Sequence, residues 1–252
     1  IIILNLVDEL VKYEKEIGEA VLELNPSVRS VCRKTGIITG TFREPQISVI
    51  AGSEDTVTTH IESGCKYRFD VRKVMFAKGN VVERSRIAKQ VKDGEVIVDM
   101  FAGLGYFSVP IGVLSKPEKV YSIELNPVSF GFLQENLKIN HIHNIEAING
   151  DNRFEVDKLV SEGVFADRVL MGYLPPPKEF LDWAFKIIKK GGILHYEDIV
   201  RVEKEQEDID RVVGDVREIG EKLGFEVELI LARKVKSYGP KTEHWVFDFK
   251  VK

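Results

Sequence analysis

The chain has 252 residues, of which 44% are hydrophobic and 30% are charged, and its formal net charge is −4. This length suits one large domain or two modest ones, and the composition is that of an ordinary globular protein. The acidic balance argues against a protein that is coated with nucleic acid over its whole surface.

The cysteines and the apolar runs indicate the cellular compartment in which the protein is expected. Cys32 and Cys65 are the two cysteines, and they form no Cys-x-x-Cys pair, which predicts a reduced, cytoplasmic protein. No apolar run approaches the ~20 residues of a membrane span, so we expect no membrane partner. The chain begins at Ile1 without a methionine, and this apolar start is too short and lacks the basic flank of a signal peptide. The sequence leaves open whether further residues precede it.

The N-terminal third has the pattern of a small α+β domain. Residues 3–20 carry apolar side chains at helical spacing and predict a first helix. Four short β-rich runs follow, separated by Gly, Pro, Asp and Ser, as in a small antiparallel sheet. These runs are 35–42, 46–52, 56–64 and 65–71.

Beyond Asp93–Gly94, predicted strands and helices alternate. The strands are 95–101, 119–125, 145–149, 167–173 and 191–200, and the helices are 106–114, 127–140, 154–161, 177–189 and 203–223. Two final strands, in 225–239 and 244–252, predict an antiparallel hairpin at the edge of the sheet. The alternation predicts a parallel sheet covered by helices. We therefore expect an N-terminal α+β domain with a connecting helix over 1–92 and a second, α/β domain over 93–252.

The segment VIVDMFAGLGYFSVPIGV, residues 96–113, predicts a strand, a glycine turn and a helix. The strand ends in Asp99, and Gly103 and Gly105 follow. In an open α/β sheet the ligand lies at the carboxyl ends of the strands, and glycines allow positive φ and a close approach to the backbone. A tight turn without a ligand is the alternative.

Polar residues at the next strand ends favour a nucleoside. Glu124 ends the second strand, where a carboxylate can accept both ribose hydroxyl hydrogens. Asp151 and Asn152 follow the third strand and can hydrogen-bond an adenine; a turn or helix cap is the alternative. A proline-rich loop at 175–177 follows the fourth strand.

The glycine pattern selects among nucleoside ligands. Phe107 and Ser108 follow Gly105 where a dinucleotide fingerprint would place its third glycine, and no P-loop lysine is present. This disfavours a dehydrogenase. Asp99 disfavours a phosphate and suits a ligand with a cationic centre, so the residues predict S-adenosylmethionine.

Several spaced motifs resemble a known family of transferases. The block 68–91 (RFDVRKVMFAKGNVVERSRIAKQV) is followed in order by IVDMFAGLGYFSVPI, IELNP, GDNR, ADRVLMGYLPPPKEF and GGILHYEDIV. Over roughly residues 45–250 the chain is similar to archaeal class I S-adenosylmethionine-dependent enzymes that modify the purine at position 37 of tRNA. The resemblance implies a class I methyltransferase, Rossmann-like α/β sheet with a smaller N-terminal α+β domain.

Two sister families share this pattern. One methylates guanine N1 at position 37, and the other transfers the 3-amino-3-carboxypropyl group of S-adenosylmethionine to 4-demethylwyosine during wybutosine synthesis. The methyltransferases carry Asn-Leu-Pro after the fourth strand, whereas this chain has Tyr173-Leu174-Pro175 preceded by Met171-Gly172. The sequence therefore favours the aminocarboxypropyltransferase, which releases 5′-methylthioadenosine. The guanine-N1 methyltransferase is the alternative, and a non-catalytic RNA-binding module is another.

The resemblance implies five cofactor-binding residues. Glu124 is expected at the ribose, and Asp151 with Asn152 at the adenine. Arg84 is expected to face the methionine moiety, and Ala77 to contribute a backbone contact. The alternatives are a solvated charge on a surface helix for Arg84 and a loop filler for Ala77.

The same resemblance implies a tRNA partner, bound at its anticodon loop with the base at position 37 flipped out. Nine Lys or Arg residues lie between Lys66 and Lys92, against Asp70 and Glu83. They form either a solvated face or a patch for phosphates. The candidates for phosphate contacts are Lys66, Arg68, Arg72, Lys73 and Lys78, with Arg233, Lys234 and Lys236 extending the surface.

No residue is assigned a catalytic role, and the oligomeric state is left open. His195 and Tyr196 are either helpers or interior residues of a strand, and an interior position is favoured. His141 and His143 are expected on the surface, and no metal site is predicted because a third ligand is lacking.

Overall fold

The computed structural model describes residues 1–40 and 42–252. The chain folds into two compact units. Unit 1 comprises Ile1–Ile61 and Lys66–Ala77, and unit 2 comprises Glu62–Cys65 and Lys78–Lys252. By its contacts, the helix that precedes Asp93 belongs to unit 2. The assignment of tRNA contacts to 1–92 and of catalysis to 93–252 stays a prediction.

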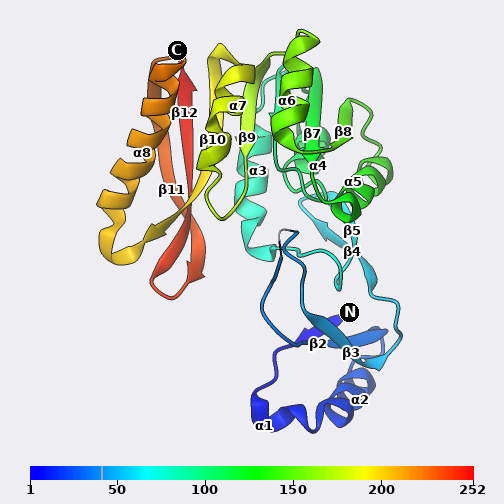
Figure 1. The fold of residues 1–252 in the computed structure, drawn as a ribbon. Coiled ribbons are helices and arrows are strands. Elements are labelled where there is room, and N and C mark those ends of the chain that lie inside the picture. The colour runs from blue at the N-terminus through cyan, green and yellow to red at the C-terminus, as the bar shows by residue number, and fades with distance from the viewer. Residues whose placement is uncertain (41) are drawn as a thin grey trace. The chain divides into compact units, whose positions relative to one another are not determined.

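Unit 1 is built on a mixed three-stranded sheet in the order β1-β2-β3 (Figure 1). Strand β1 (Ile2–Leu4) runs parallel to β2 (Ser30–Lys34), and β2 runs antiparallel to β3 (Ile47–Gly52). Helices α1 (Asp8–Val11) and α2 (Glu14–Leu24) connect β1 to β2. Helix α2 packs closely on β3, since a Cβ on Gly18 would lie 2.8 Å from the Cβ of Ala51.

Three predictions for this unit are wrong. The helix expected over 3–20 is divided into a strand and two helices. The run 35–42 forms no strand over its described residues apart from an isolated bridge at Thr39, and residue 41 lies outside the described residues. The sheet is mixed rather than antiparallel, and the prediction missed both its edge strand β1 and its central strand β2. Its sequence SVCRK has little β signature, but Val31 and Cys32 are fully buried.

A hairpin of β4 (Val57–Glu62) and β5 (Cys65–Asp70) follows. Its two turn residues both have positive φ, +49° at Ser63 and +78° at Gly64, as a type I′ hairpin turn requires. Along β5, Cys65, Tyr67 and Phe69 are buried while the intervening Lys66 and Arg68 are exposed. The strand therefore presents a basic outer face.

Unit 2 contains a seven-stranded sheet in the order β11-β12-β10-β9-β6-β7-β8 (Figure 1). Its strands are β6 (Val96–Asp99), β7 (Lys119–Glu124), β8 (Ile145–Asn149), β9 (Ala166–Met171), β10 (Ile188–Arg201), β11 (Val227–Gly239) and β12 (Thr242–Val251). Neighbours from β10 to β8 pair in parallel, whereas β12 is inserted antiparallel between β10 and β11. The predicted alternation and the terminal hairpin are thus confirmed. Chain order reverses between β6 and β9, which creates a switch point for a ligand.

Helices cover both faces of this sheet. They are α3 (Val81–Gln90), α4 (Ser108–Leu114), α5 (Pro127–Ile139), α6 (Asn152–Ser161), α7 (Leu181–Ile187) and α8 (Glu205–Lys222), with short 3-10 turns η1 (Lys78–Asn80), η2 (Lys178–Phe180) and η3 (Val202–Lys204). Helices α6, α7 and α8 share one hydrophobic core with Leu194 and Tyr196 of β10. His195 lies between these two residues in β10 and so faces the opposite side, where α3 packs beside α4. Among the described residues, no helix is long and apolar enough to cross a membrane.

Candidate functional site

The glycine turn after β6 has a backbone conformation and close side-chain contacts that require glycine at two positions. Gly103 and Gly105 both have positive φ, +58° and +101°. A Cβ on Gly103 would lie 2.4 Å from the ring of Tyr106, and a Cβ on Gly105 would lie 2.6 Å from Val109. Asn136 of α5 donates to the carbonyl of Leu104 at 2.9 Å and fixes the turn from the side. These two positions therefore require glycine.

Glu124 lies against this turn because β7 is the parallel neighbour of β6. Its Oε2 accepts from the backbone N–H of Gly103 at 2.7 Å, and its Oε1 accepts from the N–H of Asn126 at 2.7 Å. Burial raises the pKa of Glu124, although both hydrogen bonds oppose this shift. Each oxygen keeps a lone pair, so the anchored carboxylate can accept two further hydrogen bonds.

Asp151 and Asn152 begin α6 but have different surroundings. Asp151 caps the helix by accepting from the N–H of Arg153 at 2.9 Å, and it pairs with the Arg153 guanidinium at 2.5 Å, which lowers its pKa. Asp151 therefore forms the helix cap that was the alternative interpretation of this residue. Asn152 is 6% exposed and donates from Nδ2 to the carbonyl of Met100 at 3.0 Å. Its buried Oδ1 has no partner among the described residues, which leaves an acceptor for a ligand.

Arg84 is buried rather than solvated. It is 2% exposed, its Nε donates to Glu62 at 2.7 Å, and its Cζ lies 6.0 Å from the centre of the Tyr106 ring. Its interpretation as a surface charge is therefore wrong, and Tyr106 links it to the glycine turn. Ala77 is half-buried at the end of unit 1, and its backbone contact to a cofactor stays a prediction.

Asp99 lies at the centre of a polar network that sequence reasoning missed. It is fully buried, accepts from Ser108 Oγ at 2.6 Å, and Ser122 donates in turn to Ser108 at 2.7 Å. Burial, together with the nearby carboxylates of Glu124 and Glu197, raises the pKa of Asp99 to about 7, although the hydrogen bond from Ser108 opposes this shift. A cation bound near the turn would offset this crowding of negative charge.

Aromatic side chains gather where β6 and β9 end. The rings of Phe101 and Tyr173 stack with centroids 5.1 Å apart, and Phe180 meets Phe101 edge-on at 5.2 Å. Arg153 lies over the Phe180 ring at 5.5 Å. The family resemblance places Tyr173 where the methyltransferases are expected to carry the asparagine of Asn-Leu-Pro, and here that position holds an aromatic ring.

The histidines that the sequence analysis singled out lie either within the sheet or on the surface. His195 is 4% exposed and joins Asp248 through Nδ1 and Arg168 through Nε2, both at 2.5 Å. Tyr196 is 2% exposed, and burial raises its pKa. The interior interpretation of both residues is confirmed. His141 and His143 are exposed, as predicted, and no cluster suited to a metal ion occurs among the described residues.

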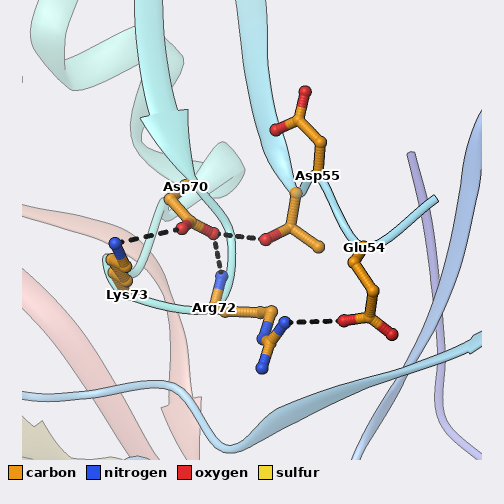
Figure 2. Close-up of a pocket in the computed structure, with 6 residues that line it drawn as sticks. Glu54, Asp55, Asp70, Arg72 and Lys73 are labelled. Atoms are coloured by element: carbon orange, nitrogen blue, oxygen red, sulfur yellow. Dashed lines mark hydrogen bonds and ion pairs between the residues drawn. The ribbon is translucent and has the colours of Figure 1, made fainter.

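The predicted phosphate-binding residues of unit 1 are exposed, and two of them, Arg72 and Lys73, have acidic partners. Arg72 pairs with Glu54 at 3.1 Å, and Lys73 lies 3.8 Å from Asp70; both contacts are drawn as dashed lines in Figure 2. They line a pocket of about 430 Å³ together with Asp55 and Thr56. In unit 2, Lys78 is exposed, Arg233 pairs with Glu83, and Lys234 pairs with Glu243.

Comparisons with known proteins match both parts of the chain. Residues 58–230 match the family model described as the TRM5/TYW2 methyltransferase domain, and residues 1–56 match the TYW2 N-terminal domain. A relative from Methanocaldococcus jannaschii, named tRNA(Phe) (4-demethylwyosine(37)-C(7)) aminocarboxypropyltransferase, is 38% identical over 95% of this chain and 98% of its own.

Two solved structures have the same fold. TYW2 of P. horikoshii in complex with MeSAdo is 37% identical, with a TM-score of 0.83 over 99% of this chain and 87% of that one. Trm5b of Pyrococcus abyssi is 35% identical, with a TM-score of 0.84 over 99% of this chain and 72% of that one. Fold similarity therefore does not separate the two branches.

Proposed function

We propose that the chain, which belongs to the TRM5/TYW2 methyltransferase family, is an S-adenosylmethionine-dependent tRNA aminocarboxypropyltransferase. It transfers the 3-amino-3-carboxypropyl group to 4-demethylwyosine at position 37 of tRNA-Phe and releases 5′-methylthioadenosine. The full-length match to a relative of that name carries this conclusion. The ring of Tyr173 in place of the methyltransferase asparagine agrees with it.

The residues around the glycine turn suit S-adenosylmethionine. The turn requires glycine at positions 103 and 105, Asn152 Oδ1 is a buried acceptor without a described partner, and the buried carboxylates favour a cation. We assign the ribose hydroxyls to Glu124 and the adenine edge to Asn152. Asp151 supports the start of α6, and its pairing with Arg153 makes it the weaker candidate for a direct contact.

Orientation decides which group is transferred. Bound S-adenosylmethionine supplies electrophilic carbons next to its sulfonium. Arg84 is the cation placed beside the glycine turn, and we assign it to the carboxylate of the methionine chain. Holding that carboxylate fixes the chain relative to the acceptor, and such alignment contributes several kcal/mol to catalysis. Ala77 is assigned a backbone contact only.

The tRNA contacts are assigned to exposed basic residues. Lys66 and Arg68 on the outer face of β5, with Arg72 and Lys73, suit the phosphates of the anticodon arm, and residues 1–92 form the principal tRNA-contacting part. Lys78 and the basic residues of β11 extend this set. A cytoplasmic location agrees with this substrate.

The small-molecule product tests the proposal. The protein is incubated with S-adenosylmethionine and tRNA-Phe that carries 4-demethylwyosine, and the products are separated by chromatography. We expect 5′-methylthioadenosine. Release of S-adenosylhomocysteine, or reaction with tRNA-Phe that carries guanosine at position 37, would instead support the guanine-N1 methyltransferase.

A further inference from the structure

A chain of buried ionic contacts joins α3 to the sheet of unit 2. Arg86 of α3 makes two hydrogen bonds to Asp248 of β12, at 2.5 and 3.0 Å. Asp248 contacts His195 of β10, and His195 contacts Arg168 of β9. Arg168 ends the chain on Glu95 with bonds of 2.8 and 3.1 Å. Exposure of these side chains ranges from 2% to 14%.

The chemistry of the donors fixes the protonation of His195. An arginine only donates, so Nε2 of His195 must accept from Arg168, and Nδ1–H must donate to Asp248. Burial lowers the pKa of His195, which agrees with a neutral ring. The neutral ring thus connects the Arg86–Asp248 pair to the Arg168–Glu95 pair without adding a charge.

This series of side-chain contacts holds α3 at two points. Arg86 lies in the middle of the helix, and Arg168 Nη2 donates at 3.1 Å to the carbonyl of Gln90, its last residue. Glu83, one turn before Arg86, is fully buried and pairs with both Arg86 and Arg233. Glu83, Arg86 and Gln90 follow the i, i+3, i+7 spacing of one helical stripe. The stripe is fixed, so α3 has a single rotational setting.

The rotation of α3 determines where Arg84 lies. Arg84 follows Glu83 directly, on an adjacent face of the helix, and contacts Glu62 and the Tyr106 ring. Buried ion pairs contribute little net stability compared with apolar packing. A long series of buried side-chain contacts that is attached to α3, the helix that carries Arg84, is therefore better explained by a role in positioning this helix than by a contribution to stability.

We propose that Arg86 and Asp248 are positioning residues that set the rotation of α3, and thereby place Arg84 on the carboxylate of the methionine chain so that the aminocarboxypropyl group is transferred. This inference rests on the proposed function. In that transfer the acceptor carbon forms a bond to the methylene next to sulfur, the methylene–sulfur bond breaks, and its electron pair stays on the sulfur of 5′-methylthioadenosine. The acceptor base then releases a proton to water. If the chain carboxylate is held wrongly, the methyl carbon competes, and S-adenosylhomocysteine is the product.

Asp248→Asn and Arg86→Lys test this role, and Asp198→Asn is the matched control. Asp198 is 1% exposed on β10 and pairs with Arg211 of α8, on the opposite face of the sheet and away from α3. For each folded variant, kcat, the KM values for S-adenosylmethionine and tRNA, and the ratio of 5′-methylthioadenosine to S-adenosylhomocysteine are measured. Circular dichroism and thermal unfolding establish the folded state.

We expect Asp248→Asn to raise the KM for S-adenosylmethionine about tenfold to a hundredfold and to increase the share of S-adenosylhomocysteine, with the KM for tRNA unchanged. Arg86→Lys, which keeps the charge, should give a smaller change in the same direction, and Asp198→Asn should give none. Wild-type KM and product ratio in a folded Arg86→Lys or Asp248→Asn variant would overturn the inference, as would an equal effect of Asp198→Asn. A wild-type protein that releases S-adenosylhomocysteine would overturn the proposed function instead, and the KM comparison would still test the positioning of Arg84.

Discussion

At the scale of single residues, the site depends on carboxylates that the fold has anchored before a ligand arrives. Both oxygens of Glu124 are held by backbone N–H groups of the glycine turn and of α5. Asp99 is held by Ser108 beneath the same turn. Such pre-positioned acceptors lose little conformational freedom on binding, which favours affinity.

Glu124→Gln should weaken binding of S-adenosylmethionine about tenfold to a hundredfold, because a hydrogen bond to a charged group contributes about 1.5–3 kcal/mol. The amide N–H₂ would also face one of the two backbone donors. Isothermal titration calorimetry measures the affinity. Glu146→Gln on neighbouring β8, where the carboxylate is half-exposed, is the control and should bind normally. Equal affinities of the two variants would contradict the ribose assignment.

Asp99 predicts a pH dependence of stability. Its folded pKa of about 7 lies above the ordinary value of 3.8, so the folded state holds a proton that the unfolded state releases. This contribution is complete below pH ~4 and is lost as the pH rises through about 7, up to ~4 kcal/mol in all. Urea unfolding from pH 4 to 8 should show that stability of the wild type falls relative to Asp99→Asn over this range. A constant difference between the two would contradict the assignment.

At the scale of elements, we assign the cofactor end of the proposed site to the glycine turn and to helix α3. The turn was predictable because β6 is a short apolar strand and glycines directly follow it. The rotation of α3 could not be predicted, because the contact that fixes it joins Arg86 to Asp248, 162 positions away in the sequence. Arg84 was predicted to face the methionine moiety, and a solvated surface position was the alternative, because helical spacing alone does not reveal its contacts with Glu62 and Tyr106.

Gly105→Ala should destabilise the protein by about 1–3 kcal/mol and abolish binding of S-adenosylmethionine, since its φ is +101° and a Cβ would meet Val109 at 2.6 Å. Gly214→Ala in α8 is the matched control, because nothing lies within 4 Å of its Cβ position. There alanine should raise stability by up to ~1 kcal/mol. Thermal unfolding with and without ligand measures both effects. A Gly105→Ala variant as stable as the wild type would show that the turn tolerates a side chain.

At the scale of the whole molecule, the alternating strands and helices of unit 2 were predictable because each parallel strand is buried and bounded by polar turns. Unit 1 was less so. The break between α1 and α2 and the central strand β2 depend on packing within the unit, as the close contact of Gly18 with Ala51 illustrates. The net charge of −4 averages over the whole chain, whereas the local run of Lys and Arg that begins at Lys66 predicted the exposed basic residues of unit 1.

Arg72→Ala should reduce tRNA affinity and lower the slope of log affinity against log salt by about one, as expected for the loss of one phosphate contact. Glu54→Gln releases Arg72 from its acidic partner and should strengthen binding at low salt. Lys204→Ala, on η3 with Glu207 as partner, is the control. Filter binding of tRNA over a range of salt concentrations gives the slopes. Equal slopes for Arg72→Ala and wild type would remove Arg72 from the tRNA contacts.

The identity of the transferred group is the central claim, and a double-label experiment tests it most directly. The protein is incubated with tRNA-Phe that carries 4-demethylwyosine and with S-adenosylmethionine labelled with ¹⁴C in the carboxylate and ³H in the methyl group. Aminocarboxypropyl transfer predicts that the ¹⁴C enters the tRNA while the ³H remains in the small-molecule product. Entry of ³H into the tRNA without ¹⁴C would contradict the account and identify the chain as a methyltransferase.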